Sequence, residues 1–422
     1  LVHSSAGQGM EVHAELQGLE AVLPGVFEAP ALQADEIQID GSLQHPPREP
    51  VSLELRQLRV RNADLDLDMR GRWRDEGAGG AGTVDLQGTL ARAAMTAIHR
   101  YLPSSVNAEA RAWLASSILV GEILDATVLL KGELADFPFN RPGSTGQFRV
   151  AGNYHGARLD YASARADTKG WPVLDNLAGH FVVDRAGLAL DSAGGLAQTG
   201  PGLNIALHDL HASIPDMDEE AQLDVQGNSS GAASAYLAIA GNSPLGALLD
   251  GALDQAEGDG DWQVPIKLHV PLDHVADMHV DGRIAFQGGA FRLAPQMPRM
   301  SDLHGGLVFS EHGLQADGLR FTFLGGPVRV SGKLGAGESL DFLGSFDTAA
   351  LDEVGRLPAW QRFSGKAAYQ GRLSYAKGGD LDVSIKSDLM GLAIGLPAPL
   401  GKAAQATLPL SLRWGPAPNS TS

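Results

Sequence analysis

The chain is organised around the stretch WPVLDNLAGHFVVDRAGLALD, from Trp171 to Asp191. It opens with a cassette of the form Pro-x-Φ-x-x-Φ-x-Gly, in which Φ is an apolar residue. The cassette occurs three times, and the first two copies lie 126 residues apart, from Pro172 to Pro298. A duplicated β unit is therefore expected to frame the chain. The structural cassette residues are Pro172, Leu174, Leu177, Gly179, Pro298, Met300, Leu303, Gly305, Pro358, Trp360, Phe363 and Gly365.

Length and composition favour a repetitive β protein. The chain has 422 residues, of which 44% are hydrophobic and 19% charged, and 53 are glycine. Charged residues usually make up about 25% of a soluble domain, and glycine about 7%. Frequent glycine and proline suit many short strands joined by tight turns. Ordinary solenoid repeats have about 20 to 50 residues, so the much longer unit here is predicted to be a multi-strand sheet.

Strict alternation supports this prediction. In DLDLDMRGRW, residues 64–73, apolar and charged residues take turns. Successive side chains of a strand point to opposite faces, so one face is expected to be apolar and the other polar. The predicted fold is mainly β: a long twisted antiparallel sheet curled into an elongated apolar groove, with a few short α-helices at insertions.

Helix signals interrupt the strands at three places and divide the chain. Thr89 and Asn107 are expected to cap a helical pair, Ser243-Pro244 to open a helix in an insert, and Asp347 to cap a helix over 349–357. The predicted segments are an N-terminal β segment (1–88), the helical pair (89–117), a first β repeat (118–228), the helical insert (229–262), a second β repeat (263–346), and a helix with the third cassette and terminal strands (347–422).

Charge and cysteine content exclude several classes of partner. The net charge is −18, which argues against a nucleic-acid partner and against binding to lipid by a basic patch. There is no cysteine, so disulfides and thiolate metal sites are excluded. The longest apolar runs are shorter than the ~18 residues of a membrane span. The chain begins and ends within its pattern, and we expect it to be a piece of a longer protein.

Motifs for catalysis are weak. The run GNSSG, residues 227–231, matches the G-x-S-x-G pattern of hydrolases and would make Ser229 a nucleophile. That motif requires a strand, a sharp turn and a helix in an α/β sheet, whereas its surroundings here are predicted to be β strands. We therefore expect a loop at Ser229, no enzymatic activity and no cofactor.

Two clusters could in principle bind metal. His269, His274 and His279 are spaced by five, and steps of five on one strand would place neighbours on opposite faces. The acidic run 254–261 lacks the glycine and glutamate positions of an EF-hand loop. Solvent-facing side chains are the simpler interpretation of both clusters, and no metal site is predicted.

Several segments resemble a known family. They are YLP…AWLASSILVGEILDATVLLKGELADFPF (101–139), the first two cassettes, and SDLMGLAIGLPAPLGKAA (387–404). They are similar to the large AsmA-like bacterial envelope proteins of the YhdP type, which are related to TamB and to bridge-like lipid-transfer proteins. The resemblance extends from about residue 50 onward, with the segments in the expected order.

The resemblance implies a role in lipid transport. Proteins of this type are held in the Gram-negative inner membrane by an N-terminal helix, project into the periplasm, and carry phospholipids towards the outer membrane, which supports its barrier. The implied partners are phospholipid acyl chains, the inner membrane through an anchor absent from this chain, and outer-membrane components, with no nucleic acid. Anchoring and bridging are therefore not expected of this chain alone.

The predicted lining of the groove follows from the alternation. Acyl chains need only a continuous apolar surface, because the hydrophobic effect is non-directional. The alternative is a structural or adhesive β-repeat envelope protein, in which the same residues fill a solid core and no lipid is carried. The candidate lipid-binding residues are Phe148, Val150, Leu188, Leu190, Ile284, Phe286, Phe309, Leu319, Phe321, Phe323, Val328 and Val330.

Overall fold

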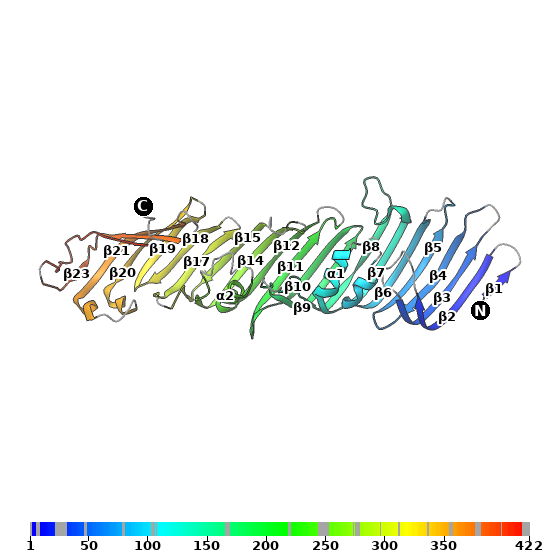
Figure 1. The fold of residues 1–422 in the computed structure, drawn as a ribbon, viewed down its shortest axis with the longest axis horizontal. Helices are drawn as coiled ribbons and strands as arrows, with labels where there is room; N and C mark the ends of the chain where they lie inside the picture. Colours follow the sequence, from blue (N-terminus) through cyan, green and yellow to red (C-terminus); the bar gives the residue numbers. More distant parts are fainter. Residues whose placement is uncertain are drawn as a thin grey trace, which may run out of the picture. The chain divides into compact units, whose positions relative to one another are not determined.

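The structure is a computed structural model. It describes all residues other than 1, 6–8, 22–31, 46–48, 78–80, 103–105, 107, 165–168, 218–220, 244–252, 273, 275–278, 296, 311–312, 336, 354–357, 376–380, 398 and 416–422. The described residues contain 24 strands and a few short helices, and the strands pair antiparallel in a sheet (Figure 1). The prediction of a mainly β, antiparallel fold is therefore confirmed.

The chain forms two compact units. The first comprises Leu1–Gln198, Leu207–Val225 and Val270–Asp277, and the second comprises Thr199–Ala206, Gln226–His269 and Met278–Ser422. Strands β11 (Leu203–Ile214) and β12 (Gln222–Ala232) contribute residues to both units, and so do the last residues of β10 and β14.

The first unit is a succession of hairpins. From β1 to β10 each strand pairs antiparallel with the next strand along the chain. Figure 1 shows β2 to β8 lying side by side in chain order. The strands are β1 (Val2–Ser5), β2 (Gly9–Ala21), β3 (Leu32–Gln44), β4 (Ser52–Arg61), β5 (Leu65–Arg74), β6 (Thr83–Ala94), β7 (Ile118–Glu133), β8 (Gln147–Leu159), β9 (Val173–Asp184) and β10 (Gly187–Gly200).

The second unit continues the same pattern with two short side strands. Pairing runs from β14 to β15 and then through β17, β18, β19, β20, β21 and β22 to β24. Strand β16 pairs with β13 and β17, and β23 pairs with β21. The strands are β13 (Glu257–Asp259), β14 (Asp261–Pro271), β15 (His279–Gln287), β16 (Ala290–Arg292), β17 (Met300–Ser310), β18 (Gly313–Phe323), β19 (Gly326–Leu334), β20 (Ser339–Asp347), β21 (Phe363–Tyr375), β22 (Leu381–Ser387), β23 (Leu392–Ile394) and β24 (Leu410–Trp414).

Short helices lie between strands. The helical pair predicted at residues 89–117 begins later than expected. Strand β6 continues through Ala94, which pairs with Glu122 of β7. The predicted helix start at Thr89 is therefore wrong, because two neighbouring strands supply ladder partners that the helical period could not reveal. The helices are η1 (Met95–Arg100), α1 (Ala108–Ser117), η2 (Leu134–Asp136), α2 (Ala233–Asn242), η4 (Thr348–Glu353) and η5 (Pro358–Arg362), of which the η elements are 3₁₀ turns.

The other helix predictions are confirmed in part. Helix α2 occupies the predicted insert, although β12 reaches Ala232 before it. The helix predicted to begin at Ser243-Pro244 lies outside the described residues. The backbone N–H of Ala349 donates to the Asp347 carboxylate at 3.0 Å, so the predicted cap is present. It opens a 3₁₀ turn that is described as far as Glu353.

The cassette is a bulge inside a strand. Its first two copies begin just before β9 and β17 and continue into them, and there Asn176 and Asp302 have φ of 53° and 54°. Each is followed by a buried leucine, Leu177 or Leu303, and the ladder register shifts there. In these two copies the cassette therefore bends a strand from within and does not join two strands. In the third copy η5 precedes β21, which begins at Phe363.

Bulges recur in adjacent strands of the first unit. Asp125 of β7 and Gly156 of β8 also have positive φ, at 50° and 59°, and register shifts accompany both. A bulge bends its strand and increases the local twist. Strands β7 to β9 therefore bend one beside the next, which curls this part of the sheet.

Candidate functional site

The first unit has one face that stays apolar from strand to strand. Cross-strand partners follow one another in a row through Ile37, Val60, Leu67, Leu90 and Ala126, which come from β3 to β7. Facing side chains in neighbouring strands lie close enough to pack. Five successive strands thus place an apolar side chain at the same level of the same face.

Four predicted lining residues lie on this face. Val150 of β8 is opposite Val183 of β9, which is opposite Leu188 of β10. Phe148 and Leu190 are two residues from Val150 and Leu188, so they share the face. Val150 and Leu190 pack against the main buried cluster of the unit, whose eight buried members are Leu65, Ala93, Ile123, Ala126, Tyr154, Ala157, Leu177 and Phe181.

The second unit has an equivalent apolar face. Ile284 is opposite Leu307, and Phe321 is opposite Val328. These strands enclose a cluster whose buried members are Ala233, Trp262, Val264, Phe286, Leu303 and Leu319. The predicted residues Ile284, Phe309, Phe321 and Val330 pack against it, and Phe323 follows Phe321 on the same face.

The apolar faces are only partly covered. Of the twelve predicted lining residues, three are buried: Phe286 (7% exposed), Leu319 (8%) and Val328 (2%). The other nine are partly exposed. Solid protein cores contain large apolar side chains that are almost fully buried and closely packed. The faces therefore present apolar surface at intermediate depth, which apolar ligands could cover further.

Short helices cover part of each face. Met95 and Ile98 of η1 pack against the first cluster, and Tyr236 and Leu237 of α2 pack against the second. Tyr101, which follows η1, connects this turn to the segment between β4 and β5: its hydroxyl donates to Asp64 at 3.0 Å. Each of these helices therefore covers one short part of an apolar face.

Ser229 has a structural role. It lies in β12, where its hydroxyl donates to the carbonyl of Val264 and contacts the Tyr236 hydroxyl, both at 2.9 Å. The Tyr236 ring stacks on Trp262 at 5.9 Å. The expected loop is wrong because this serine sits in a strand, where its hydrogen bonds connect β12 to α2 and β14. Within the described part of the chain, the hydrogen-bond partners of its hydroxyl are the Val264 carbonyl and the Tyr236 hydroxyl.

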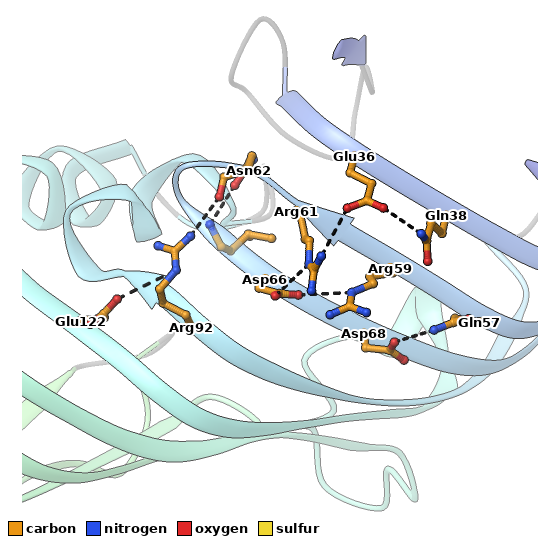
Figure 2. Close-up of polar contacts among 11 residues, drawn as sticks. Glu36, Gln38, Gln57, Arg59, Arg61, Asn62, Asp66, Asp68, Arg92 and Glu122 are labelled. Atoms are coloured by element: carbon orange, nitrogen blue, oxygen red, sulfur yellow. Dashed lines mark hydrogen bonds and ion pairs between the residues drawn. The ribbon is translucent and has the colours of Figure 1, made fainter. Parts of the chain in front are cut away.

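The opposite face is polar and mixed in charge. In the first unit Arg61 donates to Asp66 at 3.0 Å and to Glu36 at 3.4 Å across three strands (Figure 2). Further along the same face Arg92 lies 4.0 Å from Glu122 and donates to the carbonyl of Asn62 at 3.0 Å. Acidic and basic side chains thus alternate across the strands. The basic side chains of this row are therefore offset by neighbouring carboxylates.

A second polar cluster lies towards the N-terminus on the same face. The Arg56 guanidinium pairs with Asp40, and it donates to Glu11 at 2.7 Å. Its hydrogen bond holds the pKa of Asp40 below the ordinary value. These carboxylates are therefore satisfied by protein partners, as expected for a solvated structural face.

The structure places the two candidate metal clusters, the three histidines and the acidic run, differently from what their spacing suggests. Within the described part of the chain, no group of three or more His, Cys, Asp or Glu side chains is arranged to hold a metal ion. Glu257 and Asp259 lie in β13 and pair with Arg292 and Arg299, so these members of the acidic run are not in a loop. His269 and His279 lie opposite each other on β14 and β15, because Pro271 leads into a hairpin. His274 lies between β14 and β15, so the three histidines do not share one strand.

Several residues on the apolar faces were missed by sequence reasoning. Tyr154 and Phe181 are buried in the first cluster, and the Tyr154 hydroxyl donates to the carbonyl of Asp191 at 3.0 Å. Alternation alone was not enough, since the bulges shift which residues face inward. The sequence did contain a signal for these bulges. Asn176 and Asp302 are residue types that tolerate positive φ, and each stands just before an apolar residue.

Tyr369 provides a test of how well the apolar face excludes water. Its ring lies 6.3 Å from Phe342 and 6.4 Å from Phe346, and burial raises its pKa to about 12. The neutral phenol is favoured in the fold, so its contribution to stability is complete below the ordinary value of 10.0 and is lost as the pH rises through about 12.

We expect the difference in tyrosinate absorbance between the wild type and Tyr369→Phe, measured after a rapid pH jump, to titrate near pH 12. In urea the same difference should titrate near the ordinary value of 10.0. A folded-state midpoint close to the urea value would mean that water reaches this hydroxyl freely.

No helix in the described residues combines the length and the hydrophobicity needed to cross a bilayer.

Comparison with known proteins identifies the family. A family model described as YhdP protein matches residues 3–422. No curated protein and no solved structure gives a significant match. Because the family match extends over nearly the whole chain, the chain belongs to the YhdP family, an AsmA-like group of envelope proteins.

Proposed function

We propose that this chain is a non-enzymatic carrier segment that moves phospholipids along the apolar face of its sheet. The acyl chains lie against the partly exposed side chains of that face, and the polar headgroups remain in water. The segment works in the periplasm, between the inner and the outer membrane. Its transport supports the outer-membrane barrier.

One observation carries the proposal: apolar side chains meet strand after strand on one face of each unit and stay partly exposed. Burying apolar surface is worth about 25 cal/mol per Å², whatever the orientation of the ligand. Successive strands therefore offer an acyl chain similar stabilisation at each step. A ligand held in this way can shift along the face without breaking specific hydrogen bonds.

The alternative, a structural β-repeat protein without lipid, predicts different surface properties. Its apolar side chains would be covered by protein, and the apolar face would have no reason to remain continuous. The buried clusters supply stability under either function. The partly exposed lining residues favour lipid transport.

The experiment is to purify the chain, extract it with organic solvent and analyse the extract by lipid mass spectrometry. A benzophenone amino acid in place of Phe309, which points to the apolar face, should then crosslink to phospholipid under ultraviolet light. The matched control carries the benzophenone in place of Val308, the next residue on the same strand and on the opposite face.

We expect phospholipid in the extract and a lipid adduct at position 309 that is at least about tenfold more abundant than at 308. The absence of lipid from both the extract and the adduct would refute the proposed function. Equal adducts at the two positions would show that lipid does not use the apolar face.

A further inference from the structure

A pair of histidines lies side by side on the polar face of the second unit. His269 of β14 is the direct cross-strand partner of His279 of β15. Their ring centroids are 6.3 Å apart and the ring planes differ by 18°. His279 is exposed and His269 partly so. The hairpin thus brings two imidazoles together where solutes can reach them.

The surroundings of the pair are polar. Lys267 and Asp281 each lie two residues further from the turn than the histidines. They are cross-strand partners on the same face as the histidines. The next strand, β17, places Ser310 opposite Asp281. The lysine and the aspartate carry opposite charges, which offset each other beside the pair. The chain as a whole carries a charge of −18, which favours the approach of cations.

We propose that His269 and His279 form a surface binding site for a divalent transition-metal ion. Neutral imidazole nitrogen is a preferred ligand of Cu²⁺, Ni²⁺ and Zn²⁺. Two imidazoles that share an ion, with metal–nitrogen bonds of about 2.0–2.1 Å, have ring centres roughly 5–6 Å apart. The observed centroid separation of 6.3 Å lies just above this range.

The site has two protein ligands, and water completes the coordination. An ion held in this way is exchangeable, and it connects β14 to β15 beside the turn of their hairpin. Among divalent ions of the first transition row, Cu²⁺ binds a given set of nitrogen ligands most tightly, so Cu²⁺ is the probe of choice. This inference is independent of lipid transport, since both histidines lie on the polar face.

The test is a Cu²⁺ titration of the folded chain, followed by electron paramagnetic resonance of frozen samples at less than one equivalent. We expect nitrogen splitting from two equatorial imidazoles. His269→Gln and His279→Gln should each weaken the tightest Cu²⁺ site by about tenfold or more, or about 1.4 kcal/mol. The double variant should lose little more than either single variant, because one imidazole alone does not chelate.

The matched controls are His274→Gln, in the turn of the same hairpin, and His211→Gln, which contacts Asp191 on another pair of strands. Both should keep the wild-type affinity, and thermal unfolding should confirm that all variants fold. The proposal is overturned if the wild-type spectrum shows fewer than two imidazoles, if both single variants bind like the wild type, or if a control loses as much affinity as they do.

Discussion

Replacing Gly305 by alanine should destabilise β17 and β18 by about 3 kcal/mol or more. Gly305 ends the second cassette with φ of 89°, and a Cβ there would overlap the carbonyl of Gly318 on the neighbouring strand. Two costs combine: the backbone conformation is strained for alanine, and the two strands must separate. The loss should appear as faster hydrogen exchange of β17 and β18 amides and as a lower urea midpoint for the second unit.

Gly318→Ala is the matched control for this prediction. Gly318 also has positive φ, at 63°, but a Cβ there meets no atom within 4 Å. The control therefore carries only the conformational cost, about 1–2 kcal/mol. If the two alanine variants unfold at the same urea concentration, the close approach of the strands does not contribute, and the interpretation of the cassette as a tightly packed bulge is wrong.

The cassette illustrates what the sequence could and could not predict. Its recurrence and the alternation around it correctly predicted a sheet made of repeated hairpins. Its role as a bulge was not predicted, because Asn176 and Asp302 look like ordinary polar residues of a strand. Their positive φ depends on the neighbouring strands, to which the ladder register must adapt.

The prediction of a helix from Thr89 was wrong for a related reason. Residues 89–94 carry apolar residues at helical spacing, yet they belong to β6, where Ala93 faces Leu65 and Ile123. Tertiary pairing overrides a weak local preference. The Asp347 cap was predicted correctly because a cap depends only on the next few residues of the chain.

The sequence predicted which face of the sheet the candidate lining residues share, but it did not predict how deeply each side chain is buried. Alternation placed Phe321 and Val328 on the same side of neighbouring strands. It could not show that Val328 is 2% exposed while Phe321 stays partly exposed. That difference depends on which helices and bulges cover each position, and it decides which residue is suited to a test of lipid binding.

Phe321→Asp should leave the chain folded and reduce its bound phospholipid by about tenfold or more. Phe321 is partly exposed, so a carboxylate there can reach water and costs about 1–3 kcal/mol, well short of a buried unpaired charge. A charge on the apolar face should exclude acyl chains from that part of the sheet, since burying it under an acyl chain would cost several kcal/mol.

Thr322→Asp is the control, because Thr322 is the next residue of β18 and faces the other way. It adds the same charge and should keep the wild-type lipid content. Lipid mass spectrometry and thermal unfolding of the three proteins distinguish the two functions. If Phe321→Asp unfolds the second unit while the wild type carries no lipid, Phe321 belongs to a filled core, and the chain is a structural β-repeat protein. If it folds and loses lipid while Thr322→Asp retains it, the apolar face is the surface that holds the acyl chains.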